Sequence, residues 1–113
     1  MLTIKNIDKI VGLLANGREI VEAGDYVDSL RKNGKDYFVF KIARVKDGID
    51  YNKEHDIVLT KETNENGKYC MFNMGLQIRT EIELHKDNLI SATELAHSIR
   101  NVLVKTQTYY QTN

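Results

Sequence analysis

The side chains with the most chemical potential lie in one polar segment, residues 46–56. It holds four carboxylates, an amide and the imidazole of His55, the groups from which hard-cation and proton-transfer sites are built. A pocket around Asp50, Glu54 and His55 is therefore the enzyme hypothesis that this sequence allows. An EF-hand loop counted from Asp47 fails, because Ile49 takes the third position and Asn52 the sixth, where an oxygen ligand and a glycine are required. We expect a solvated hairpin loop here.

The remaining histidines and the cysteine give no second candidate. His55, His85 and His97 are far apart, and none has a partner ligand at helical spacing. Cys70 is the only cysteine and alternates with two large apolar residues, which indicates a small buried side chain. Glycine-rich phosphate loops, G-x-S-x-G elbows and H-E-x-x-H helices are missing from the sequence. The sequence therefore predicts no catalytic residue, no cofactor and no metal, and a non-enzymatic protein.

The clearest structural signals lie in the last third of the chain. Residues 76–85 alternate between apolar or Thr and polar side chains, which predicts an antiparallel strand with one face in water. Ser91 and Glu94 have the spacing of a capping box, so a helix should begin near Ala92. Its core-facing residues would be Leu95, Ile99, Val102 and Leu103, with Ile90 and Leu95 forming a hydrophobic staple.

The rest of the chain reads as one further helix and a run of strands. Apolar residues at helical spacing from Ile4 to Leu14, with Thr3 as N-cap, predict an amphipathic helix. A short strand over 18–23 follows. Residues 25–32 are ambiguous between a helical turn and a strand. We favour a strand over 26–31 that pairs with 36–45 through an Asn33-Gly34 turn. Strand 36–45 is apolar on both faces, which predicts the middle of the sheet. A loop over 46–55, a strand over 56–61, a turn over 62–67 and a strand over 68–74 complete the series.

These elements predict an α+β fold: an antiparallel meander sheet of about five strands with an N-terminal and a C-terminal helix. With 113 residues, we expect a single domain over 1–105 and a polar C-terminal tail over 106–113 of undetermined conformation.

Composition limits the partners. Sixteen basic and sixteen acidic residues cancel, so a polyanion is at a disadvantage as a ligand. One cysteine fits a reducing compartment, and apolar stretches fall short of the ~20 residues that a membrane span needs. We expect a cytoplasmic protein without membrane partners. Many Lys, Asn and Ile residues and no proline suggest an AT-rich genome, such as that of a phage or mobile element.

The leading functional hypothesis is a small non-catalytic protein-binding domain, which binds and modulates a host protein, for example as an inhibitor, or self-assembles. Its candidate contact residues are Arg79, Glu81 and Glu83 on the outer face of the alternating strand, and Tyr109 and Tyr110 in the tail. Tyrosine and arginine are favoured at interfaces, and an extended segment can add to a sheet edge.

A nucleic-acid-binding accessory protein is the alternative hypothesis. Its basic residues would be Arg31, Lys32 and Lys35 at the hairpin tip, and Arg100 and Lys105 in the last helix. Phosphate contacts by these side chains would make the affinity fall steeply with salt.

Overall fold

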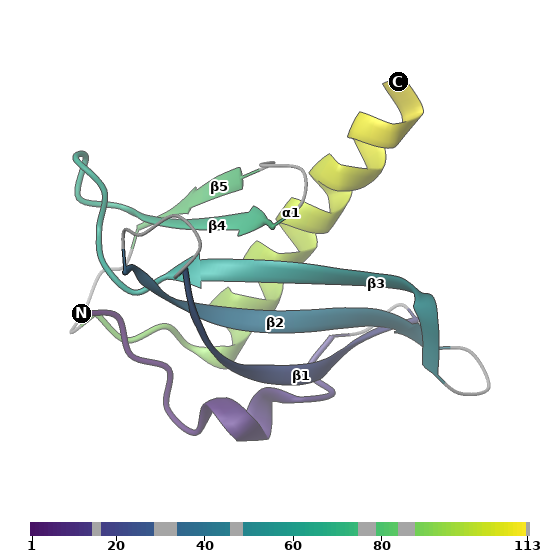
Figure 1. Ribbon diagram of the computed structural model, residues 1–113, viewed down its shortest axis with the longest axis horizontal. Helices are drawn as coiled ribbons and strands as arrows, with labels where there is room; N and C mark the ends of the chain where they lie inside the picture. The colour runs from purple at the N-terminus through teal and green to yellow at the C-terminus, as the bar shows by residue number, and fades with distance from the viewer. Residues whose placement is uncertain (15–16, 29–33, 46–48, 75–78, 84–87, 113) are drawn as a thin grey trace.

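The residues that the structure describes form a five-stranded antiparallel sheet with one long helix packed against it (Figure 1). The strands are β1 (Arg18–Val27), β2 (Asp36–Val45), β3 (Ile49–Thr60), β4 (Tyr69–Asn73) and β5 (Arg79–Ile82), and the helix is α1 (Ala92–Thr112). The strands lie in the sheet in the order in which they occur in the chain. The predicted antiparallel meander and C-terminal helix are therefore confirmed.

The computed structural model describes residues 1–14, 17–28, 34–45, 49–74, 79–83 and 88–112. Within these ranges it describes the backbone alone for Asp8, 44–45, 49–55, Arg79 and 107–112. No helix in the described part of the chain is long and apolar enough to cross a membrane.

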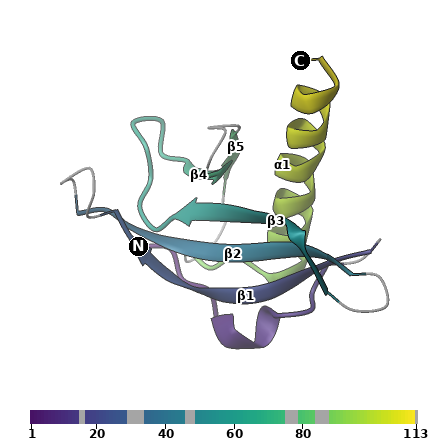
Figure 2. The same cartoon turned by 45° about the vertical axis from the view of Figure 1, so that its right-hand side comes forward.

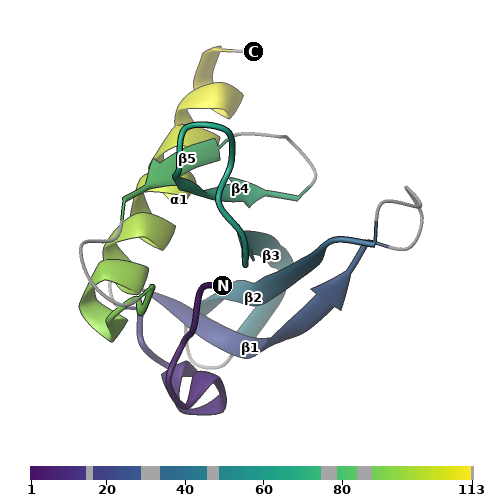
Figure 3. The same cartoon turned by 90° about the vertical axis from the view of Figure 1, so that its left-hand side faces the viewer.

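One face of the sheet, called here the inner face, carries the core. The β2 residues Phe38 and Phe40 lie opposite Leu59 and Ile57 of β3, and Met71 of β4 lies opposite Leu59. All five side chains are buried, with Phe40, Ile57, Leu59 and Met71 fully enclosed. Figure 3 shows α1 on this one side of the sheet. Burial of large apolar side chains at about 1.5–3 kcal/mol each is the main force that holds the two layers together.

Helix α1 begins where the capping box predicts. The Oγ of Ser91 accepts a hydrogen bond from the Glu94 backbone N–H at 3.2 Å, and the Leu95 N–H donates to the Ser91 carbonyl. The predicted stripe is confirmed at Leu95, Ile99 and Val102, each of which is 0% exposed. The helix continues to Thr112, so residues 106–112, whose conformation the sequence left open, are helical.

The predicted N-terminal helix is wrong: only a four-residue 3₁₀ helix, η1 (Ile7–Ile10), forms there. Asn6 takes a left-handed conformation (φ 55°) and Gly12 has φ 88°, which interrupts a continuous helix on both sides. Residues 2 and 3 instead donate backbone hydrogen bonds to Lys61 and Asn88. Apolar residues of the N-terminal segment are nevertheless buried: Leu2, Ile10 and Leu14 belong to the same core as the buried residues of α1.

Three strand predictions also need correction. The first strand runs continuously to Val27 and pairs with β2 along its length, so there is no separate strand starting at 26; residues 29–31 lie outside the described chain. The segment predicted as a loop over 46–55 is strand from Ile49 onward, because it pairs back onto the end of β2. The middle strand is β3, which lies between β2 and β4, whereas β2 is second in the sheet. Strand β2 has apolar residues on both faces because Tyr37 and Val39, on its outer face, are also half-buried.

Tyr69 gives a test of the packing between β4 and residues 88–90. Its hydroxyl donates to Asn88 Oδ1 at 2.9 Å, and burial together with the Glu62 carboxylate raises the pKa of Tyr69 above its ordinary value of 10.0. The folded chain then holds this proton more tightly than the unfolded chain, so the free energy of unfolding falls as the pH rises above 10.0.

We expect Tyr69→Phe to lose about 0.5–1.5 kcal/mol at pH 7, the net contribution of one hydrogen bond, and to lose less additional stability at high pH than the parent. Urea unfolding of both proteins at about pH 7 and about pH 11 measures the difference. Equal alkaline losses in both proteins would show that Tyr69 titrates alike in the folded and unfolded chains.

Candidate functional site

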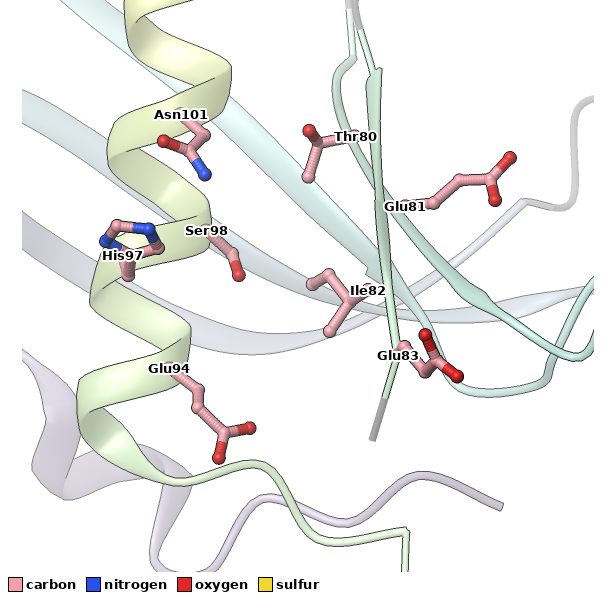
Figure 4. Close-up of a pocket in the computed structure, with 8 residues that line it drawn as sticks. All are labelled: Thr80, Glu81, Ile82, Glu83, Glu94, His97, Ser98 and Asn101. Atoms are coloured by element: carbon pink, nitrogen blue, oxygen red, sulfur yellow. The ribbon is translucent and has the colours of Figure 1, made fainter. Parts of the chain in front are cut away.

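A groove of about 360 Å³ lies between the edge strand β5 and helix α1 (Figure 4). Its strand side consists of Thr80, Glu81, Ile82 and the following Glu83, and its helix side of Glu94, His97, Ser98 and Asn101. The groove is open to solvent along one side. It is the candidate site of this chain.

The helix side of the groove follows from helical periodicity. Positions 94, 98 and 101 are four and three residues apart, so their side chains lie above one another on one face of α1. This face is next to the buried stripe of Leu95, Ile99 and Val102, which fixes the distance of α1 from the sheet. In Figure 4 the side chain of Ser98 points toward β5, Asn101 lies along the helix, and His97 points away from β5.

The strand side offers a backbone as well as side chains. Strand β5 is the last in the sheet, and among the described strands it pairs with β4 alone. Alternate residues of an antiparallel edge strand direct their N–H and C=O groups away from the neighbouring strand. The free side of β5 can therefore pair with one more extended segment.

Inner-face residues Thr80 and Ile82 face the helix across the groove, as Figure 4 shows. Ile82 is 8% exposed and forms an apolar floor. Lys105 of α1 donates from Nζ to Thr80 Oγ1 at 3.0 Å, one helical turn beyond Asn101. This hydrogen bond links α1 to β5 at one end of the groove.

The other end of the groove is acidic. Glu83 and Glu94 are exposed and line it, and neither has an ion pair or side-chain hydrogen bond with another described residue. Glu81, which Figure 4 shows pointing away from the helix, lies 4.0 Å from the Lys68 ammonium. The lining contains three carboxylates and no lysine or arginine among its eight residues. The described lining of the groove therefore carries more acidic than basic side chains.

The three strand residues predicted as contacts, Arg79, Glu81 and Glu83, lie in β5 or directly after it. Arg79 and Glu81 lie opposite Phe72 and Cys70 of β4, which puts them on the outer face, and only the backbone of Arg79 is described. Glu83 follows β5 and lines the groove. Their assignment to a partner interface stays a prediction.

The other predicted contact residues lie elsewhere. Tyr109 and Tyr110 belong to the last turns of α1, which project beyond the sheet (Figures 1 and 2), and only their backbone is described.

Arg31 and Lys32 lie outside the described residues. Lys35 is exposed directly before β2, and Figure 3 shows the start of β2 at the end of the sheet far from α1. Arg100 and Lys105 are exposed on α1. A spacing of five residues places them about 140° apart around the helix axis. The assignment of these basic residues to a nucleic-acid surface stays a prediction.

Residues 49–56 of the polar segment 46–56 belong to β3. Asp50 pairs with Arg44 and His55 with Ile42, and the register shifts between these two pairs. For Asp50, Glu54 and His55 only the backbone is described, so their role stays a hypothesis. In the described part of the chain, no cluster of three His, Cys, Asp or Glu residues could hold a metal ion. Cys70 is buried on the outer side of β4, as its alternation predicts.

Sequence reasoning missed the groove itself. Its helix side was visible as polar positions at helical spacing next to an apolar stripe, but a solvated helix has the same pattern. The position of that face beside the edge strand arises only from tertiary packing. Comparisons of this chain with protein-family models, with curated proteins and with solved structures give no match, so its function must be argued from this geometry.

Proposed function

We propose that this chain is a non-catalytic protein-binding domain that adds an extended segment of a partner protein to the free edge of β5. The observation that carries the proposal is the groove, which is open to solvent and bordered by an edge strand and a helix face. Addition of a strand to a sheet edge is a recurrent way to recognise peptides, in which backbone hydrogen bonds provide affinity and side-chain pockets provide specificity.

The groove supports each part of that binding mode. The β5 backbone supplies donors and acceptors, Ile82 supplies an apolar contact, and the polar residues of α1 supply groups that can select side chains of the segment. Successive side chains of an added strand alternate between the two faces of the sheet. Every second side chain would therefore enter the groove.

The occupant we propose is a separate protein. A second copy of this chain paired through β5 would place Glu81 opposite Glu81 in one register and opposite Arg79 in another, and like charges in opposing positions are destabilising. The experiment below distinguishes the two occupants.

A peptide selection with mapped binding tests the proposal. Random nine-residue peptides, displayed on messenger RNA, are enriched on the immobilised protein, and the recovered peptides are titrated into ¹⁵N-labelled protein. We expect the largest shifts at the amides of β5 and of α1 between Glu94 and Asn101. Enrichment of no peptide, or shifts elsewhere only, would overturn the proposal.

Two substitutions on neighbouring helix positions sharpen the test. Asn101→Trp places a large side chain in the groove, and we expect at least a tenfold loss of peptide affinity. Arg100→Trp is the matched control, because Arg100 is exposed on the same helix but does not line the groove. Equal effects of both substitutions would contradict the site. A dimer whose formation protects the same β5 amides as the protein concentration rises would show that the occupant is a second copy.

A further inference from the structure

We infer that Asn66 is a site of spontaneous covalent modification, deamidation to aspartate and isoaspartate, and that Asn64 controls its rate. The site lies in the turn between β3 and β4, where an asparagine directly precedes a glycine. This dipeptide occurs three times in the sequence, and only Asn66-Gly67 lies wholly within the described residues. The turn does not line the groove, so the inference is independent of the proposed function.

The reaction uses the backbone of Gly67 as its nucleophile. The nitrogen of Gly67 loses its proton and forms a bond to Cγ of Asn66. The bond from Cγ to the side-chain nitrogen breaks, so ammonia leaves and a five-membered imide remains. Water then opens the imide, at Cγ to give aspartate or at the backbone carbonyl carbon to give isoaspartate. The sum is one water consumed and one ammonia released, and nothing is oxidised or reduced. Glycine favours the first step because no Cβ hinders the approach of its nitrogen.

Both reacting residues are accessible to water. Asn66 and Gly67 are exposed, and Gly67 has a φ of 73°. The position that a Cβ of residue 67 would occupy has no atom within 4 Å other than those of its chain neighbours. Solvent base and water can therefore reach the reacting atoms.

Asn64 restrains the reaction through hydrogen bonds. Three successive N–H groups donate to it: those of Asn66 and Lys68 to the side-chain Oδ1 at 2.9 and 3.0 Å, and that of Gly67 to the backbone carbonyl at 3.0 Å. The proton that Gly67 must lose is thus held in a hydrogen bond. Asn64 is itself fixed, because its N–H donates to the Lys68 carbonyl at 2.8 Å and its Nδ2 donates to Cys70 Sγ at 3.5 Å. Attack on Asn66 therefore requires the turn to open, and the rate follows how often it opens.

Conversion changes both the shape and the charge of the turn. Isoaspartate adds one carbon to the backbone path at position 66, so the three N–H groups cannot all keep their acceptors on Asn64. Aspartate keeps the backbone path and adds a negative charge to a turn that already contains the exposed Glu62 and Glu65. Each product is therefore distinguishable from the parent chain.

The folded protein and a synthetic peptide of residues 62–68, incubated side by side at mildly alkaline pH, give the first readout. A brief tryptic digest releases residues 62–68 of the protein as one peptide, and tandem mass spectrometry locates the converted amide at Asn64 or Asn66. We expect conversion at Asn66 in both samples. It should be about tenfold slower in the folded protein than in the free peptide, because only the open turn reacts.

Two substitutions of Asn64 give the second readout. Asn64→Ala removes the Oδ1 acceptor, so Asn66 should convert about fivefold faster than in the parent, with each rate divided by that of a peptide carrying the same substitution. Asn64→Asp is the matched control, because its carboxylate keeps an acceptor for the N–H groups of residues 66 and 68. It should convert no faster than the parent. Both variants lose the bond to Cys70 Sγ, so the difference between them measures the acceptor alone.

Three results would overturn the inference. If neither the parent nor Asn64→Ala converts at Asn66 over many half-lives of the peptide, the folded chain has no modification site there. If the folded parent converts as fast as the peptide, or if the alanine and aspartate variants convert alike, Asn64 does not control the rate. Circular dichroism checks that Asn64→Ala is folded, and if it is not, the comparison of the parent with the peptide decides the question.

Discussion

Replacing Leu95 with alanine should lower the free energy of unfolding by about 2–5 kcal/mol, a large share of the stability of a small domain. Leu95 is fully buried in the first turn of α1 and belongs to the core that contains Ile99 and Val102. Truncation removes its transfer free energy and leaves a cavity between helix and sheet. Urea denaturation followed by circular dichroism measures the loss.

The matched control is Val104→Ala on the same helix. Val104 is 62% exposed, so its substitution should change the free energy of unfolding by no more than about 0.5 kcal/mol. Similar losses for Leu95 and Val104 would mean that the helix packs on the sheet by a different face. The groove would then not exist as described, because Ser98 and Asn101 hold their places only through this packing.

Replacing Phe40 with alanine should cost about 3–5 kcal/mol, the usual range for a buried aromatic side chain. Phe40 is 0% exposed at the centre of the inner face of β2 and lies opposite Ile57 of β3 and Ala23 of β1. No small side-chain movement can refill a space of this size, since the neighbouring strands are fixed by backbone pairing. Thermal and chemical unfolding both report the loss.

Tyr37→Ala is the aromatic control on the outer side of the same strand. Its ring contacts Tyr26 and Phe72 at centroid distances of 6.1 and 6.0 Å, but the side chain is only half-buried. Aromatic pairs of this kind contribute about 0.5–1.5 kcal/mol beyond burial, so the loss should be well below that of Phe40. If Tyr37→Ala proved as damaging as Phe40→Ala, the assignment of the inner face to the core would be wrong.

The sequence predicted the elements whose signals are local. The bounds of β2, the start of α1 at Ala92 and its buried stripe all match, because alternation, capping and helical spacing act within a few residues. The β5 strand also lies within its predicted range, although only Arg79–Ile82 is described as strand.

The errors have long-range causes. Residues 3–14 have helical spacing, yet Thr3 pairs with Leu89 in a parallel bridge, and its backbone bonds reach residues 88 and 90. A contact across more than eighty residues is invisible to a periodicity argument, and it outweighed the local preference. The same holds for the start of β3, where pairing with β2 converted a polar, loop-like segment into strand.

The candidate site was only half predictable for the same reason. Glu81 and Glu83 were expected at an interface because they lie on an alternating, half-exposed strand. Thr80 and Ile82 were expected to face the core, and nothing local shows that β5 is the edge of the sheet or that Ser98 and Asn101 lie across from it. Strand order and helix placement are needed to bring these residues together.

The central claim is that the free side of β5 pairs with an extended segment. Nuclear Overhauser contacts between backbone protons in a complex of the labelled protein with a selected peptide test it most directly. The account predicts the pattern of an added β-strand, with contacts from peptide backbone protons to those of residues 79–82 and slowed exchange of the β5 amides that point outward. A complex whose contacts lie only on the last turns of α1 or on the outer face of the sheet, with β5 amides exchanging as in the free protein, would contradict it.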